Sequence, residues 1–107
     1  MAYEDRVLDA LGDRTRRTVF ARLRSGERSV NELADGLKVS RPAVSQHLRV
    51  LRAARLVTYR RAGTRRLYAV DRRGVKTLRD WLDGFWDQTL AAFKEAAERE
   101  AAKERKP

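Results

Sequence analysis

Two helix-start signals, at Ser29 and at Ser40, stand so close together that only a short helix fits between them. Ser29 and Glu32 have the spacing of a capping box, in which each side chain accepts a hydrogen bond from the other residue's backbone N–H. Ser40 is a natural N-cap, and Pro42 falls in the first turn of the next helix, where its missing N–H breaks no intrahelical bond. The spacing therefore predicts a short helix, a tight link at 38–40 and a second helix.

The helix after Ser40 is expected to run from about Arg41 to Ala53 and to have two contrasting faces. At ~100° per residue, Val44, Leu48 and Leu51 share one face. The opposite face carries Pro42, Ser45, Gln46 and Arg49. His47, the only histidine, lies on the flank of the apolar seam. The pattern indicates a helix-turn-helix, although an ordinary amphipathic helix pair with one solvated side shares it.

The segment LVTYRRAGTRRLYAV, residues 56–70, predicts a β-hairpin with Gly63 in its turn. Arginine pairs flank the expected tip, Arg60 and Arg61 on one strand and Arg65 and Arg66 on the other. A hairpin that follows a recognition helix is a wing, and arginines on a wing can reach phosphates or a narrow minor groove.

The net charge of +10 comes from the middle of the chain. Residues 38–73 hold all of the excess of Lys and Arg, because Asp71 is their only acidic residue, whereas residues 1–37 and 74–107 are balanced. A one-sided excess inside a folded segment costs self-repulsion, so a polyanionic partner is the simplest explanation.

Apolar periodicity organises the remaining chain into one domain. Tyr3, Val7 and Leu11 predict a first helix within 1–12, Asp13 caps the next, and a helical core spans 13–54. The wing covers residues 56–71, a C-terminal helix covers 74–100, and a polar tail covers 101–107.

The long C-terminal helix has an apolar stripe too wide for this small head to cover, so it is expected to pack against a second subunit. The predicted dimer interface consists of Tyr3, Val7, Leu78, Trp81, Leu82, Phe85, Trp86, Thr89 and Phe93. A small apolar ligand near the two tryptophans is the alternative use of the aromatics.

Composition excludes several classes of function. The chain has no cysteine and one histidine, so thiolate metal sites, disulfides and thiol nucleophiles are ruled out, and we expect no cofactor. No nucleophile–base pair or phosphate-binding glycine loop suggests an enzyme. No apolar run approaches the ~20 residues that span a bilayer, and the N-terminus lacks a signal-peptide layout, so a cytoplasmic location is expected.

The motifs D-x-T-R-R from Asp13, S-x-x-x-V-S-x-H-L-x-x-L from Ser40 and R-R-L-Y from Arg65 occur together, and the chain thereby resembles the ArsR-type winged-helix repressors over about residues 8–90. The final helix is most similar to the metal-independent, SdpR-like autorepressor branch. The resemblance implies a mostly α winged helix-turn-helix with a small β-hairpin wing, dimerised through its terminal helices. It further implies a homodimer that binds an inverted repeat in double-stranded DNA. Asp80, Asp83 and Asp87 favour hard cations only weakly.

The expected DNA contacts join the recognition helix to the wing. They are Ser40, Arg41, Pro42, Ser45, Gln46, His47, Arg49, Arg60, Arg61, Arg65 and Arg66. His47 is expected beside DNA, with a bracing role in the helix as the alternative. The family usually has glycine at the position of Arg55, so either Arg55 adopts a left-handed conformation at a cost of ~1 kcal/mol or the helix ends differently.

These observations predict a sequence-specific, autoregulatory transcriptional repressor. A general nucleic-acid-binding or architectural protein is the alternative that the charge also permits, and an adaptor that binds proteins through its long helix is a third. The operator, the regulated genes and the inducing signal or ligand do not follow from the residues.

Overall fold

The computed structural model describes residues 2–105 and confirms both helix starts. Helix α3 (Val30–Ala34) follows the expected capping box: the Ser29 hydroxyl accepts from the Glu32 N–H at 3.3 Å, and the Glu32 carboxylate accepts from the Ser29 N–H at 2.9 Å. Helix α4 (Arg41–Ala53) begins where the Ser40 hydroxyl accepts from the Ala43 N–H at 3.2 Å. The two helices form the predicted helix-turn-helix, but their link spans residues 35–40 and not only the predicted 38–40. Helix α3 ends early because Gly36, at a φ of 76°, leaves the helical conformation.

Two further helices complete the helical head. Helix α1 (Tyr3–Ala10) precedes α2 (Arg14–Ala21), which a 3₁₀ helix, η1 (Arg22–Ser25), continues. The Asp13 carboxylate caps α2 by accepting from the Arg16 N–H at 2.8 Å. The apolar faces of these helices meet in one core, whose fully buried larger side chains are Val7, Val19, Leu33, Val44, Leu48, Leu51, Leu56 and Val57.

A three-stranded antiparallel sheet closes one side of the head, where the sequence predicted only a hairpin. Strands β2 (Val57–Ala62) and β3 (Arg65–Val70) form the predicted wing, with Gly63 at a φ of 65° in its turn. Strand β1 (Arg28–Ser29) pairs with β3 on its other edge. A strand of two residues has no alternation to detect, so periodicity could not predict it.

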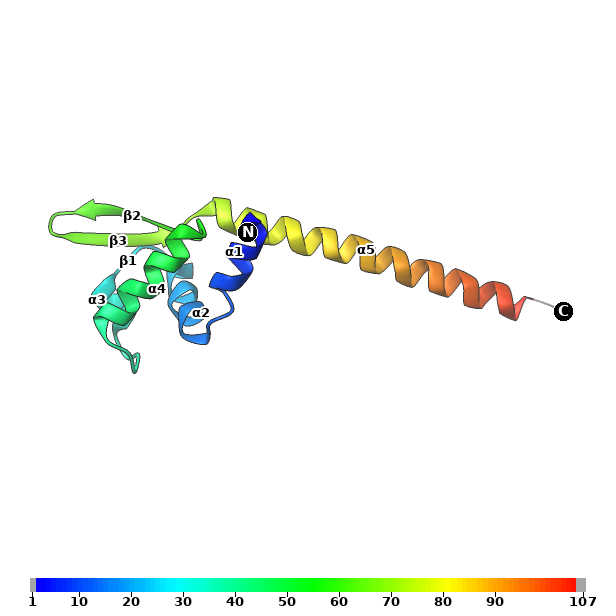
Figure 1. Ribbon diagram of the computed structural model, residues 1–107, viewed down its shortest axis with the longest axis horizontal. Helices are drawn as coiled ribbons and strands as arrows, with labels where there is room; N and C mark the ends of the chain where they lie inside the picture. Colours follow the sequence, from blue (N-terminus) through cyan, green and yellow to red (C-terminus); the bar gives the residue numbers. More distant parts are fainter. Residues whose placement is uncertain (1, 106–107) are drawn as a thin grey trace.

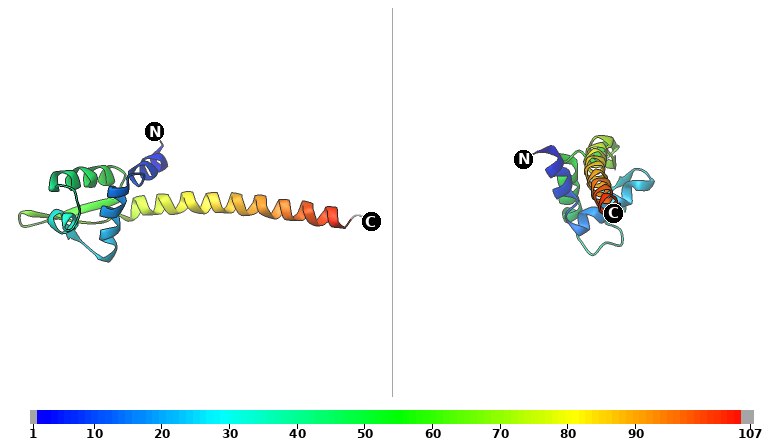
Figure 2. Two further views of the ribbon diagram at one scale, coloured as in Figure 1. Left: turned by 90° about the horizontal axis from the view of Figure 1, so that it is seen from below. Right: turned by 90° about the vertical axis from the view of Figure 1, so that its right-hand side faces the viewer.

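Helix α5 (Arg72–Glu104) leaves the head and extends far beyond it (Figure 1). The molecule measures 77 × 27 × 26 Å, and its radius of gyration of 20.2 Å exceeds the ~13 Å expected of a compact chain of 100 residues. Helix α1 packs beside the first turns of α5, and most of α5 is solvent-exposed in this single subunit (Figure 2).

The boundaries of α5 differ from the predicted 74–100. The Asp71 carboxylate accepts from the Arg73 N–H at 3.0 Å, so the helix begins at Arg72. It also continues through 101–104, which was predicted to be part of a polar tail. Ala101 and Ala102 are good helix formers, and polarity alone does not end a helix. Residues 106 and 107 of that predicted tail lie outside the described residues.

Two ends of helix α4 were predicted as alternatives, a left-handed Arg55 or a different helix end, and the structure has the left-handed Arg55. Arg55 has a φ of 57°, in the left-handed region. Its N–H donates to the Arg52 carbonyl at 2.9 Å, and the Leu56 N–H donates to the Leu51 carbonyl at 2.9 Å. This is a Schellman motif with arginine where glycine is usual, and the buried Leu51 and Leu56 provide its apolar contact. The wing therefore starts from an ordinary helix terminus.

Candidate nucleic-acid interface

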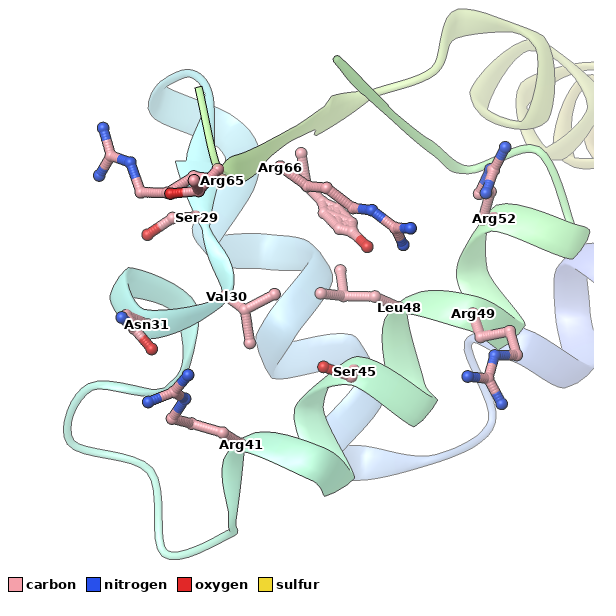
Figure 3. A pocket seen from close by; sticks show the side chains of 12 residues that line it. Ser29, Val30, Asn31, Arg41, Ser45, Leu48, Arg49, Arg52, Arg65 and Arg66 are labelled. Atoms are coloured by element: carbon pink, nitrogen blue, oxygen red, sulfur yellow. The ribbon is translucent and has the colours of Figure 1, made fainter. Parts of the chain in front are cut away.

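A groove of about 350 Å³ lies between α4 and the wing. One side of α4 lines it with Arg41, Ser45, Arg49 and Arg52, and the wing contributes Arg65 and Arg66 (Figure 3). The floor and far wall are Ser29, Val30, Asn31, Leu48, Thr64 and Tyr68. Among these lining residues, all within the described chain, there is no carboxylate. Five arginines therefore line one groove without an acidic residue in its wall, which suits a polyanion.

The predicted contacts of α4 fall on different sides of the helix. Arg41, Ser45 and Arg49 line the groove, whereas Gln46 is exposed on the outer face. The Gln46 side-chain oxygen accepts from Arg49 Nη1 at 2.9 Å, so this hydrogen bond links a residue of the outer face to a residue that lines the groove. Ser40 and Pro42 are exposed at the start of the helix, and the Ser40 hydroxyl is occupied by its capping bond.

His47 lies on the flank of α4 opposite the groove. It is half-buried, and it is close enough to Asp13 for its charge to lower the pKa of that carboxyl. The larger cause is the backbone N–H of Arg16, which donates to Asp13. The structure thus places His47 beside the N-terminus of α2, away from the wing and its arginines.

The four wing arginines are divided between the two faces of the hairpin. Arg61 pairs in register with Arg66, and Arg60 pairs with Leu67, so alternation puts Arg61 and Arg66 on one face and Arg60 on the other. Figure 3 shows Arg66 pointing toward α4 and Arg65 extending away from it, past Ser29. Arg61 lines a shallow hollow at the wing tip together with Gly63 and Thr64.

Arg60 has a carboxylate partner. Its Nε and Nη2 atoms donate to the two oxygens of Glu27 at 2.7 and 3.0 Å. This bidentate contact with Arg60 holds the pKa of the Glu27 carboxyl below its ordinary value of 4.5 and raises the pKa of Arg60. Because Glu27 neutralises this cation and accepts from its Nε and Nη2 donors, we leave Arg60 out of the proposed DNA contacts.

Sequence reasoning missed two residues of this interface. Arg52 lines the groove, and it shares a face with Arg41, Ser45 and Arg49 by helical spacing, a signal that could have identified it. Tyr59, on β2, lies under two guanidinium groups: Arg52 Cζ is 4.3 Å and Arg66 Cζ 4.6 Å from its ring centroid. Only the folded structure brings α4 and the two strands together at this ring.

The predicted dimer stripe is largely exposed on α5. Its large apolar residues are 41–63% exposed, namely Trp81, Leu82, Phe85, Trp86 and Phe93, and Leu90, which was not in the predicted set, is exposed beside them. Trp81 and Phe85 stack with centroids 5.7 Å apart. Tyr3 and Leu78 are half-buried against their own subunit, and the Tyr3 hydroxyl donates to the Ala54 carbonyl at 2.7 Å. The prediction that Val7 belongs to the dimer interface is corrected, because Val7 is 0% exposed in the core of its own subunit and is unavailable to a partner.

Within residues 2–105, no three His, Cys, Asp or Glu side chains are placed so that they could hold a metal ion. Across the same residues, no helix has the length and apolarity needed to cross a membrane.

Comparison with known proteins agrees with this geometry. The family model "Bacterial regulatory protein, arsR family" matches residues 13–59. The HTH-type transcriptional regulator Rv2034 of Mycobacterium tuberculosis is 51% identical over 96 residues, which cover 90% of each chain. The structure of an ArsR-like transcriptional regulator from Rhodococcus sp. RHA1 is similar with a TM-score of 0.70 and 34% identity, over 89% of this chain and 92% of that one.

A further solved structure bears on assembly. It is the homodimeric winged helix-turn-helix DNA-binding domain of Mb0332 from Mycobacterium bovis, described as a possible ArsR-family regulator. The similarity has a TM-score of 0.64 and 27% identity, over 82% of each chain.

Proposed function

This chain belongs to the ArsR family of bacterial transcriptional regulators, and from that membership and its geometry we propose that it is a sequence-specific repressor that binds an inverted repeat as a homodimer. Members of this family regulate transcription and are not enzymes. The observation that carries the proposal is the groove between α4 and the wing, which five arginines line without a carboxylate.

The DNA contacts that we propose divide into two groups by chemistry. Arg41, at the start of α4, has the forked donors that recognise guanine, and Gln46, on the outer face, can pair with adenine. Ser45, Arg49, Arg61, Arg65 and Arg66 are better suited to phosphates. Ser40 and Pro42, at the start of α4, are proposed to contact the sugar–phosphate backbone of the DNA. His47 is proposed as a contact at the edge of the interface.

The homodimer is supported by the apolar stripe of α5. Apolar side chains from Trp81 to Phe93 stay exposed on a helix that projects from the head, and patches of this kind mark protein interfaces (Figure 1). A second copy of this chain carries the same stripe, so two α5 helices can cover one another, and the Mb0332 domain is a homodimer of the same fold. Two recognition helices related by a two-fold axis would read half-sites ~34 Å apart.

We propose that the protein works without a cysteine-based metal site and regulates its own gene, as the metal-independent branch does. The support is compositional, since the chain has no cysteine and its one histidine is in α4. If so, operator binding is the same with zinc ions and with a chelator. A strong loss of binding on adding zinc would overturn this part of the proposal.

The test of function is a titration of the protein with the DNA upstream of its own gene and with a scrambled duplex, at several salt concentrations. We expect the upstream DNA to bind at least ~10³-fold more tightly than the scrambled duplex. Equal affinity for both, with only a shared salt dependence, would identify a general nucleic-acid-binding protein instead.

A further inference from the structure

The ring of Tyr59 lies between the recognition helix and the wing. Arg52 reaches it from α4 with its Cζ atom 4.3 Å from the ring centroid, and Arg66 reaches it from β3 with its Cζ atom 4.6 Å away. Tyr68, opposite Tyr59 in the strand register, packs against the same ring with centroids 5.4 Å apart. One half-buried aromatic side chain therefore holds two cations from different elements at the groove.

The two guanidinium groups are held in a way that leaves their donors available. A guanidinium on an aromatic ring contacts it by charge and by its face, so its N–H groups remain free to donate. Within residues 2–105, neither Arg52 nor Arg66 has a carboxylate within ion-pair distance. The Tyr68 hydroxyl, a neutral acceptor, lies beside Arg66 and raises the pKa of its guanidinium, but it leaves the charge of Arg66 unneutralised.

Arg60 is the counterexample on the same hairpin. It stands next to Tyr59 in the sequence, but its Nε and Nη2 atoms both donate to Glu27. A carboxylate neutralises its cation and occupies its donors, whereas an aromatic ring does neither. On the wing, Arg60 is therefore paired with a carboxylate, whereas Arg66 is oriented by an aromatic ring and its positive charge is not neutralised.

We propose that Arg52 and Arg66, oriented by Tyr59, form a binding site for the phosphodiester backbone of DNA, with Tyr59 as its positioning residue. The ligand class follows from the chemistry: phosphate oxygens accept bidentate hydrogen bonds from guanidinium groups, and the groove contains no acid that would repel them. The inference rests on the proposed function, because it names the part of the DNA that this side of the groove binds.

The experiment measures binding of the full chain to the upstream duplex and to a scrambled duplex across a range of salt concentrations. Arg52→Gln and Arg66→Gln should each weaken binding to both duplexes alike. Each should also reduce the salt slope, the decline of log K with log salt, by about 1.8, because the substitution removes one cation from each subunit of the proposed dimer. Arg60→Gln is the matched control, one arginine removed from the same hairpin, and it should leave the slope unchanged.

Tyr59 is tested by a pair of substitutions that leave every charge in place. Tyr59→Leu removes the ring and should weaken binding about threefold to tenfold, because two cation–π contacts no longer orient the donors. Its salt slope should fall as well, although no cation has been removed. Tyr59→Phe keeps the ring and should bind like the unmodified protein. A purely structural role would lower the melting temperature or the active fraction and leave the slope unchanged.

The outcomes separate this inference from the proposed function. Unchanged slopes for Arg52→Gln and Arg66→Gln would overturn the phosphate site even if the protein prefers its own upstream DNA. Equal affinity of the unmodified protein for both duplexes would overturn sequence specificity but would leave the slope test of the phosphate site valid. If the unmodified protein binds no duplex at low salt, both proposals are wrong.

Discussion

The backbone N–H of Gly74 donates to the carbonyl oxygen of Arg55 at 2.7 Å, so the start of α5 lies directly on the end of α4. A Cβ on Gly74 would stand 2.9 Å from the Ala54 oxygen and closer still to the Arg55 oxygen. Both contacts involve backbone, which cannot swing aside as a side chain does. The joint between α4 and α5 therefore requires glycine at position 74.

We expect Gly74→Ala to lower the free energy of unfolding by about 1–3 kcal/mol through overpacking at this joint. Gly84 is the control, since it lies in the same helix and a Cβ there would meet nothing within 4 Å. Gly84→Ala should raise stability by about 0.5–1 kcal/mol, because alanine is the better helix former. Urea unfolding of both variants measures the two effects. Similar changes for both would show that the close approach at Gly74 is unimportant.

The left-handed conformation of Arg55 gives a second prediction about the same joint. Arg55→Gly and Arg55→Ala both remove the side chain, whose Cζ atom lies 5.1 Å from the Tyr3 ring centroid, so they differ chiefly in how well they tolerate a φ of 57°. We expect the glycine variant to be more stable than the alanine variant by about 1 kcal/mol. Thermal unfolding compares them directly, and equal stabilities would mean that the helix end rearranges.

The elements that could be predicted from the sequence are those whose signals are local. The capping box at Ser29, the cap at Ser40 and Gly63 in the hairpin turn each rest on a few adjacent residues, and the structure has all three. Strand β1 could not be predicted, because it exists only where β3 provides an edge.

The same division applies to the candidate site. Helical spacing predicts which residues of α4 share a face, and Arg41, Ser45 and Arg49 do line one groove. The pairing of Arg60 with Glu27 and the meeting of Arg52 with Tyr59 depend on how strands and helices pack. Burial also decides which apolar residues remain for a partner, and it removed Val7 from the predicted interface.

The cap of α2 should make stability depend on pH in the acidic range. The N–H of Arg16 and, secondarily, the nearby His47 lower the pKa of the Asp13 carboxyl from its ordinary 3.8. The ionised carboxyl therefore stabilises the fold above that value, and this contribution is lost as the pH falls through the lowered pKa. Asp13→Asn keeps a capping oxygen but removes the charge, so it should be less stable than the unmodified protein at pH 7. Urea midpoints of the two proteins should converge as the pH falls from 3.8 through the lowered pKa, and a difference that stays constant below pH 3.8 would contradict this account.

The exposed stripe of α5 predicts an assembly that one substitution disrupts. Phe85 is 55% exposed within the stripe, so Phe85→Glu would place a charge in the proposed dimer interface and should shift the protein to a monomer at micromolar concentration. Asp87→Ser, on the other side of the helix, should leave the assembly unchanged. Sedimentation of both variants at several concentrations tests the prediction. A dimer that survives Phe85→Glu would place the interface elsewhere.

His47 is the residue for which the sequence and its structural surroundings suggest different roles. Its place in the recognition helix predicts a DNA contact, yet it is half-buried beside Asp13, on the flank of α4 away from the groove. We expect His47→Ala to weaken operator binding about threefold to tenfold, the value of one lost hydrogen bond. His47→Gln, which keeps donors and an acceptor near the same place, should retain part of that affinity. Melting temperatures of both variants provide the control for folding. If His47→Ala binds the operator as tightly as the unmodified protein but melts at a lower temperature, the residue braces α4 against α2, and Arg41, Gln46 and Arg49 read the DNA without it.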